Sequence, residues 1–323
     1  MEETGILTVE KIDGKSTVTR CFSKYPLKLI IPKKAGSSTT DAVWVFSLSY
    51  GGGIVSVLKN PVYDITNLDD ISLSVSDLVR IAVGFQGDRV VVGMSVGDGC
   101  TVALTTQAST KVYKSVDSKC SEQVLEAKVG RNALLAVIPD PVTCFTTAIY
   151  SQKQVFRISS DSNLVIVDWI TSGRHESGEK WDFEFYKSSN SILLDGGEPL
   201  FVDSVLLEQT STTSVAERMK DYQVVAMVII LGPKLKQLQD LIQSEVEHMM
   251  SGYFRPTKVQ KMSSESSANW PSRPPIFASC SSFGAKAGVV VRLLSTTTEA
   301  VYAFLRHHLS GLEQFLGASP YRR

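Results

Sequence analysis

Cysteine is scarce in this sequence, and no two cysteines form a recognisable pair. The five residues are Cys21, Cys100, Cys120, Cys144 and Cys280, an odd number at wide spacing with no C-x-x-C. This pattern excludes a disulfide framework and a zinc knuckle, and it is typical of proteins from reducing compartments. We therefore expect a cytoplasmic protein.

Long apolar runs are also missing. The run Val224–Leu231 is less than half as long as a membrane span, so no membrane partner is expected. Residues 1–15 carry acids before bases and no long apolar segment, which is unlike a secretory signal or a transit peptide.

Net charge is absent, because 33 Lys and Arg balance 33 Asp and Glu. A chain without a net positive field is a poor binder of nucleic acid phosphates, so no nucleic acid partner is expected. The hydrophobic content of 43% in 323 residues is enough for a substantial core and excludes global disorder.

Histidine is rare as well, with His175, His248, His307 and His308 as the complete set. No H-E-x-x-H or H-x-x-x-H motif is present, and neighbours such as His307 and His308 point about 100° apart on a helix. The pair is therefore not expected to chelate one ion, and no tight, permanent metal site is predicted.

One short motif suggests hydrolase chemistry. Residues 93–97 read GMSVG, which matches the G-x-S-x-G nucleophile elbow. The elbow needs a helix after its serine, whereas Asp98-Gly99 predicts a hairpin turn that leads into another strand. A serine hydrolase is thus a disfavoured alternative.

The pattern that is present is mainly β. Short β-branched or aromatic runs recur between Gly, Asp, Asn and Ser, without the regular strand–helix alternation of a doubly wound fold or a TIM barrel. The alternation in Trp181–Phe185 predicts a half-buried strand. The expected strands are 28–31, 43–48, 89–94, 101–105, 133–138, 155–158, 164–169, 181–186, 191–194, 202–208, 224–231, 276–281 and 288–293.

Two helices are predicted near the C-terminus. The first runs from Pro233 to Gly252 with an apolar face that includes Leu241. The second opens with a capping box at Thr296 and continues to Leu316 with a broad apolar stripe. Between them, residues 255–275 are rich in Ser and Pro and predict a flexible linker.

Two polar segments carry a specific resemblance. Residues 105–115 read TTQASTKVYKS, and residues 167–183 read VDWITSGRHESGEKWDF, of which 168–181 alone would most simply form a hairpin. With YPLK at 25–28, GGGIV at 51–55, EPL at 198–200 and the YxxLR pattern at 302–306, these segments resemble, in order and over nearly the whole chain, the UreD (UreH) family of urease accessory proteins.

The resemblance implies a non-enzymatic chaperone that forms a single domain over residues 1–323. The family fold is mainly β, a β-helix-like stack of strands with two α-helices near the C-terminus. Family members bind the urease apoprotein with UreF-type and UreG-type accessory proteins and assist nickel insertion into the urease active site. A tunnel through the fold is thought to pass the metal, so nickel is expected in transit and no cofactor is expected to be bound permanently. A plain interaction module without a metal role is a further alternative.

The resemblance also assigns residues. A transient nickel path falls on Asp88, Ser109, Asp168 and Glu179, although Asp168 could equally be a strand-end residue that bonds the turn backbone. Structural roles fall on Lys111, Tyr113 and Arg174, and partner contacts on Tyr302 and His308 near the end of the last helix.

The chain departs from the family pattern in two places. The family often has an acidic residue near Cys144, where this chain reads PDPVTCF. Segment 57–86 interrupts a glycine turn, because joining Ser56 to Gly87 restores GGGIVSGD. The codons at its two ends can match the edges of a spliceosomal intron, which predicts a retained intron that is translated, and hence a eukaryotic source. We expect the segment to protrude from the fold and to pack poorly, with the flanking strands pairing as if it were absent. A genuine surface insertion is the alternative.

Overall fold

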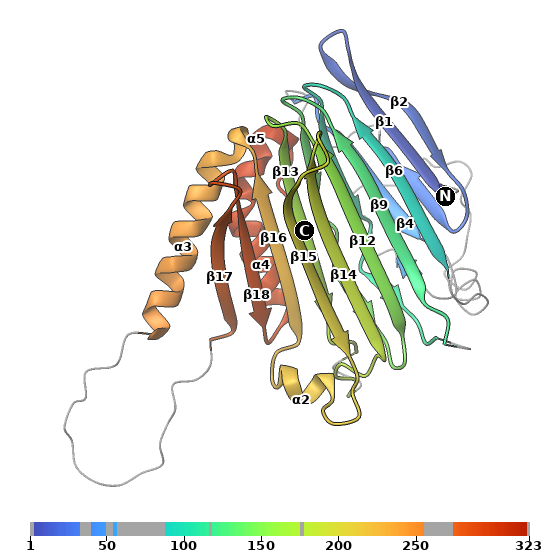
Figure 1. The fold of residues 1–323 in the computed structure, drawn as a ribbon, viewed down its shortest axis with the longest axis vertical. Coiled ribbons are helices and arrows are strands. Elements are labelled where there is room, and N and C mark those ends of the chain that lie inside the picture. Colours follow the sequence, from blue (N-terminus) through green and yellow to red (C-terminus); the bar gives the residue numbers. More distant parts are fainter. Residues whose placement is uncertain are drawn as a thin grey trace, which may run out of the picture.

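The computed structural model describes residues 3–32, 40–49, 54–56, 88–115, 118–174, 178–254 and 274–321. Two β-sheets lie face to face, and helices cover the outer face of one of them (Figure 1). The predicted insertion at 57–86 and the predicted linker, apart from Pro274 and Pro275, lie outside the described residues.

Sheet A runs in the order β15-β14-β12-β9-β6-β1-β2. Its bounds are β1 Gly5–Ile12, β2 Lys15–Ser23, β6 Arg89–Val96, β9 Ser121–Val129, β12 Ile149–Ile158, β14 Phe185–Leu194 and β15 Pro199–Glu208. Strands β1, β2 and β9 were not among the expected strands.

Sheet B runs in the order β17-β18-β16-β13-β10-β7-β4-β3, and the short strands β5, β8 and β11 extend it beside β13. Its bounds are β3 Leu27–Ile30, β4 Val43–Ser49, β5 Ile54–Ser56, β7 Thr101–Thr106, β8 Thr110–Val112, β10 Leu134–Val137, β11 Val142–Cys144, β13 Asn163–Thr171, β16 Val224–Leu231, β17 Ile276–Phe283 and β18 Gly288–Ser295.

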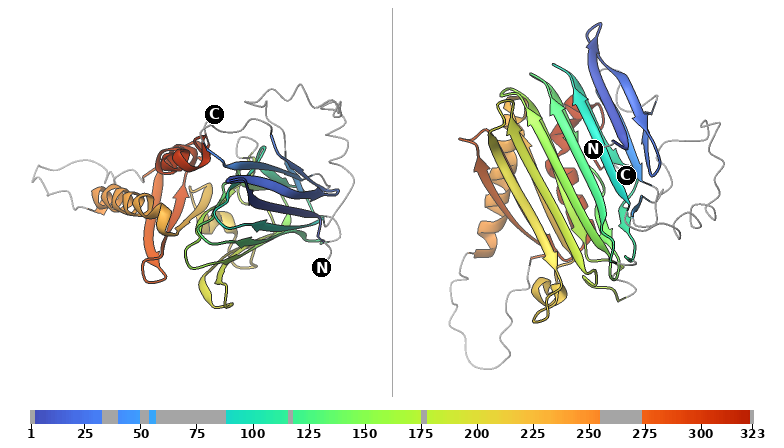
Figure 2. Two further views of the ribbon diagram at one scale, coloured as in Figure 1. Left: turned by 90° about the horizontal axis from the view of Figure 1, so that it is seen from above. Right: turned by 45° about the vertical axis from the view of Figure 1, so that its right-hand side comes forward.

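The chain passes between the two sheets at each turn of the stack. From β6 to β14 it visits sheet A and sheet B alternately, and each strand except β8 pairs in parallel with a strand from the turn before it, whereas β8 pairs antiparallel with β5. This is a β-solenoid-like stack, as the resemblance implied, and Figure 2 shows its two layers from above.

The stack corrects two local expectations. Asp98-Gly99 joins β6 in sheet A to β7 in sheet B, and the segment after β13 likewise leads into β14 of the other sheet, so neither connection is a hairpin. Gly99 takes the positive φ of 68° that a tight turn needs, but this turn connects a strand of one sheet to a strand of the other.

Strand β13 shows why the stack holds together. Every residue of Asn163–Thr171 is buried. Leu164 and Ile166 face sheet A, whereas Val165, Val167 and Trp169 face the helices. A strand covered on both faces is expected to be apolar almost throughout, so its one charged side chain, Asp168, is conspicuous.

The helices that follow β16 pack against the outer face of sheet B (Figure 1). After a 3₁₀ turn η2 Pro233–Leu235, α3 Lys236–Phe254 buries Leu238, Ile242 and Val246, while Leu241, expected on the same face, is 51% exposed. The remaining helical segments are α2 Val215–Met219, α4 Thr298–His308, η3 Ser310–Leu312 and α5 Glu313–Leu316.

The last predicted helix is in fact divided. Thr297, one residue after the predicted cap, accepts a hydrogen bond from the Ala300 amide and starts α4. The helix ends at His308 because Ser310 and Gly311, both weak helix formers, follow Leu309. The apolar stripe continues through η3 and α5 into the core.

The predicted strand at Trp181–Phe185 is wrong. Trp181 has a φ of +55°, and β14 begins only at Phe185. The side chains of Trp181 and Phe183 are buried while Asp182 and Glu184 are exposed. The alternation in sequence thus records alternate burial along a connecting segment and not a hydrogen-bonded strand.

Candidate functional site

The interior between the sheets changes from apolar to polar along the strands. On β12, Phe156 and Ile158 lie in the apolar core, whereas Gln152 and Gln154 are buried amides. On β14, Ile192 lies in the apolar core. The buried polar residues Gln152, Gln154, Asp168, Ser188 and Asn190 are called the interior polar cluster below.

Asp168 is the charged member of this cluster and is 7% exposed. Its Oδ1 accepts a hydrogen bond from Gln152 Nε2 at 3.2 Å, and its Oδ2 accepts bonds from Ser188 Oγ at 2.5 Å and Asn190 Nδ2 at 2.6 Å. Burial nevertheless raises the pKa of Asp168, and the nearby Asp203 charge acts in the same direction. The carboxyl group is therefore held by neutral donors from the facing sheet.

Two stacked tyrosines adjoin the cluster. The Tyr150 and Tyr186 rings lie with their centroids 5.9 Å apart, and both rings are buried. The Tyr150 hydroxyl lies 3.0 Å from Gln123 Oε1 and 3.1 Å from Gln152 Oε1. Burial raises the pKa of both phenols, so they remain neutral donors at physiological pH.

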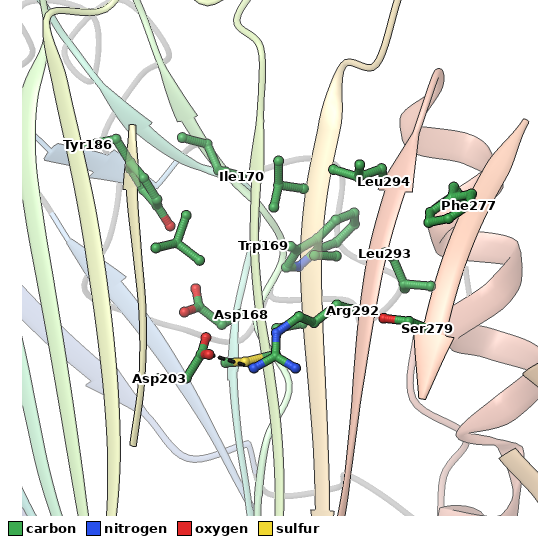
Figure 3. A pocket seen from close by; sticks show the side chains of 14 residues that line it. Asp168, Trp169, Ile170, Tyr186, Asp203, Phe277, Ser279, Arg292, Leu293 and Leu294 are labelled. Atoms are coloured by element: carbon green, nitrogen blue, oxygen red, sulfur yellow. Dashed lines mark hydrogen bonds and ion pairs between the residues drawn. The ribbon is translucent and has the colours of Figure 1, made fainter. Parts of the chain in front are cut away.

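A pocket of about 280 Å³ reaches Asp168 from the side where β15 and β18 approach each other (Figure 3). Asp203 on β15 and Arg292 on β18 form an ion pair of 2.6 Å across it. Tyr186, Met227 and Phe277 contribute apolar surface. Asp168 is thus a buried acid that lines a pocket.

Glu179 lies in a different cluster. It forms an ion pair with Arg174, with Arg174 Nη2 2.5 Å from Glu179 Oε1, and this contact lowers the pKa of Glu179. The Arg174 guanidinium lies 4.7 Å from the centre of the Phe145 ring, which meets the Tyr113 ring edge-on at 5.2 Å. The structure therefore brings together Tyr113, Arg174 and Glu179.

The other predicted path residues lie elsewhere on the stack. Asp88 precedes β6, its carbonyl accepts a bond from the Glu122 amide at 2.8 Å, and its charge helps to raise the pKa of Tyr25. Ser109 is half-buried between β7 and β8, and Lys111 lies on β8 in register with Thr143 of β11. Burial raises the pKa of the nearby Cys144 thiol, so it stays protonated.

The serine of the G-x-S-x-G motif does not form a nucleophile elbow. Ser95 lies within β6, in register with Thr8 on one side and Lys128 on the other. A turn and then a strand follow it, whereas the elbow requires a sharp strand-to-helix turn. The hydrolase alternative therefore gains no support from the geometry.

Comparison with known proteins identifies the family. A family model described as "UreD urease accessory protein" matches residues 83–323. This chain belongs to the UreD family.

Relatives in this family extend over nearly the whole chain. A "Urease accessory protein D" from Oryza sativa subsp. indica is 56% identical over 321 residues, which covers 98% of this chain and 95% of the relative. The protein of the same name from Arabidopsis thaliana is 52% identical and covers 98% and 99%, respectively. A "Urease accessory protein UreD" from Sorangium cellulosum is 31% identical and covers 99% and 83%. The resemblance inferred from the two polar segments is confirmed.

The candidate site around Asp168 contains residues that the sequence did not suggest. Gln152, Ser188, Asn190, Asp203 and Arg292 were not among the residues that the sequence assigned to a site. In the sequence, residues 151–154 (SQKQ) of β12 and 187–191 (KSSNS) of β14 are continuous polar runs, so no alternation marks one face of these strands as internal.

Tyr302 and His308, predicted to contact a UreF-type partner, both have partners within the chain. The Tyr302 hydroxyl donates to Asp140 Oδ1 at 2.7 Å, and its ring meets Trp169 edge-on at 4.8 Å. His308 is 7% exposed and packs on Phe304, and burial lowers its pKa. Their contact with a partner stays a prediction.

In the part of the chain that the structure describes, no helix combines the length and apolar character needed to cross a membrane.

Proposed function

We propose that this chain acts in urease maturation as a non-enzymatic chaperone that holds the urease apoprotein together with UreF-type and UreG-type accessory proteins. In this role it helps to move nickel into the urease active site, with nickel as cargo and not as a resident cofactor. Membership in the UreD urease accessory protein family supports the general role.

The observation that carries the nickel part of the proposal is the environment of Asp168. It is a buried carboxyl group that lines a pocket, surrounded by amide and hydroxyl groups. Oxygen and amide donors bind nickel less tightly than sites built from imidazole and thiolate, so a cation could enter and leave such a cluster. The Asn190 Oδ1 atom is buried without a hydrogen-bond partner among the described residues and is a further oxygen ligand.

The buried charge of Asp168 also favours binding of a cation. A cation beside Asp168 would stabilise its ionised form, which burial alone disfavours. Glu179, Asp88 and Ser109 are proposed as further steps of the path, as the family resemblance implies. Glu179 already exists as a carboxylate, because Arg174 stabilises its charge.

Activation of a urease apoprotein by co-expressed accessory proteins tests this function. Asp168→Asn keeps the size of the side chain but removes the charge, and we expect lower urease activity and lower nickel content with an intact complex. Asp13→Asn, in the exposed turn between β1 and β2, is the matched control. Equal activation by both variants would contradict a role of Asp168.

A second pair of variants examines Glu179. Glu179→Ala should lower activation while the fold and the UreF-type complex persist, whereas the exposed Glu184→Ala should have little effect. Loss of the fold would assign Glu179 a structural role. Normal activation with intact complexes for both Asp168→Asn and Glu179→Ala would favour the plain interaction module.

A further inference from the structure

Three potential metal ligands meet where α3 and α4 cross. Glu245 comes from the middle of α3, and His307 and His308 are the last residues of α4. The Glu245 Oε2 atom lies 3.1 Å from His307 Nε2 and 2.9 Å from His308 Nδ1. All three ligand atoms lie within 4.8 Å of one another.

This arrangement removes the geometric argument for the expectation that His307 and His308 do not serve one ion. The two rings do diverge, with an interplanar angle of 78°, but Nε2 of His307 and Nδ1 of His308 both lie close to Glu245 Oε2. Glu245 from the neighbouring helix lies between them and supplies the third ligand. Sequence spacing along one helix could not show this contribution.

The buried member of the cluster has a ring nitrogen that no hydrogen bond from the described residues satisfies. His308 is 7% exposed, and its Nδ1 meets no hydrogen-bond partner at a suitable angle among the described residues, although Glu245 Oε2 is 2.9 Å away. A buried ring nitrogen without a hydrogen bond is costly. A cation between Nδ1 and the carboxylate would satisfy both atoms.

The distances suit a partly formed site. Bonds of about 2.0–2.1 Å to nitrogen and oxygen place neighbouring ligand atoms roughly 3 Å apart, close to the two observed contacts with Glu245. The two ring nitrogens could be as far apart as 4.8 Å, so His307 would have to turn inward. Its side chain is 69% exposed and can do so, whereas His308 is fixed by the Phe304 ring at 4.0 Å.

We infer that Glu245, His307 and His308 form a binding site for a divalent transition-metal ion of the zinc or nickel class. Two imidazoles and one carboxylate are the donors that such ions prefer, and the exposed side leaves a fourth position for water or another ligand. The ion fastens α3 to α4 on the outer face of sheet B. The carboxyl group of Asp168 lies on the opposite face, so this site is separate from the proposed nickel path.

Metal binding by the purified chain tests the site independently of urease activation. The full chain without a polyhistidine tag is freed of metal with EDTA and titrated calorimetrically with Zn²⁺ and, separately, Ni²⁺. Co²⁺ absorption reports the coordination geometry. We expect one equivalent that His307→Ala weakens by about 100-fold, and a metal-dependent rise in melting temperature that this variant loses.

The choice of variants keeps the result interpretable. His307 is exposed, so His307→Ala should fold normally, and Glu245→Gln removes the charge of a second ligand with little change in shape. His248→Ala removes an exposed histidine of the same α3 helix outside the cluster and is the matched control. Unchanged affinity in both His307→Ala and Glu245→Gln, or an equal loss in His248→Ala, would overturn the inference.

Discussion

Arg292 on β18 and Asp203 on β15 connect sheet B to sheet A through an ion pair of 2.6 Å at the pocket that reaches Asp168. Strand β15 is the last strand of sheet A, and β18 lies next to the edge of sheet B. The contact therefore joins the two layers near their open margin. It also neutralises a carboxylate whose charge raises the pKa of Asp168.

Removing the arginine should loosen this margin. The Arg292 side chain is 49% exposed and that of Asp203 is 16% exposed, so solvent screens the pair and we expect Arg292→Met to lower the free energy of unfolding by about 1 kcal/mol. Chemical denaturation measures the change. Arg157→Met, at an exposed position of β12, should cost less than half as much. Equal losses for the two variants would show that the ion pair adds no stability.

Ionisation of Asp168 should make stability depend on pH. Because its pKa is raised in the folded state, the folded chain binds its proton more tightly than the unfolded chain. The contribution of neutral Asp168 is complete below the unfolded-state pKa near 4 and is lost as pH rises through the folded-state pKa. The free energy of unfolding should therefore fall with rising pH relative to that of Asp168→Asn.

Denaturation of the two proteins between pH 4 and pH 8 measures this effect. The curves of free energy against pH should diverge as pH rises, with the wild-type curve lower relative to the variant at the high end. Parallel curves would mean that Asp168 has the same pKa in both states.

The apolar stripe of the last helical segments lies in the core. Leu312 is fully buried, and the Trp44 indole donates to the Leu316 carbonyl at 2.9 Å. Leu312→Ala should cost about 2–5 kcal/mol of stability, whereas the exposed Gln314→Ala should cost less than about 0.5 kcal/mol. Thermal and chemical unfolding of the two variants compare them.

This burial also changes how partner binding must be tested. Deleting residues 306–323 should abolish binding of a UreF-type protein, but it removes Leu309, Leu312 and Leu316 from the core and should destabilise the whole chain. Arg306→Glu alters the exposed face of α4 alone and should weaken the complex without unfolding. Normal binding by a stable Arg306→Glu protein would place the partner elsewhere.

Much of the fold could be predicted where burial leaves a local pattern. The apolar run at Val224–Leu231 is strand β16, and the spacing of Leu238, Ile242 and Val246 marks the buried face of α3. The path between sheets could not be predicted in this way. Asp98-Gly99 favours a tight turn whether the next strand returns beside the last or crosses to the other sheet, so turn chemistry does not identify the pairing partner.

The candidate sites show the same limit. A sequence motif identified Asp168, but its hydrogen-bond donors Gln152 and Ser188 come from other strands and lie beside it only in the folded chain. In the same way, Glu245 and His307 lie on helices that are separated in sequence by β17 and β18. Contacts between distant segments leave no mark in a single sequence.

Segment 57–86 should be dispensable for folding. Strand β5 ends at Ser56 and pairs with β8, and β6 begins at Arg89 and pairs with β1 and β9, so the flanking strands do not depend on pairing with each other. Joining Ser56 to Gly87 also restores the glycine turn of the UreD family. A chain that lacks residues 57–86 should therefore unfold at the same or a higher temperature than the full chain, because a shorter loop costs less entropy to close.

Sequencing the mature transcript separates the two origins of this segment. A retained intron predicts that most transcripts lack its codons, whereas a genuine insertion predicts that all carry them. Deletion of residues 57–86 can also contradict the prediction. If the shortened chain fails to fold while the full chain folds, the segment contributes to the core, and its description as an aberrant insertion is wrong.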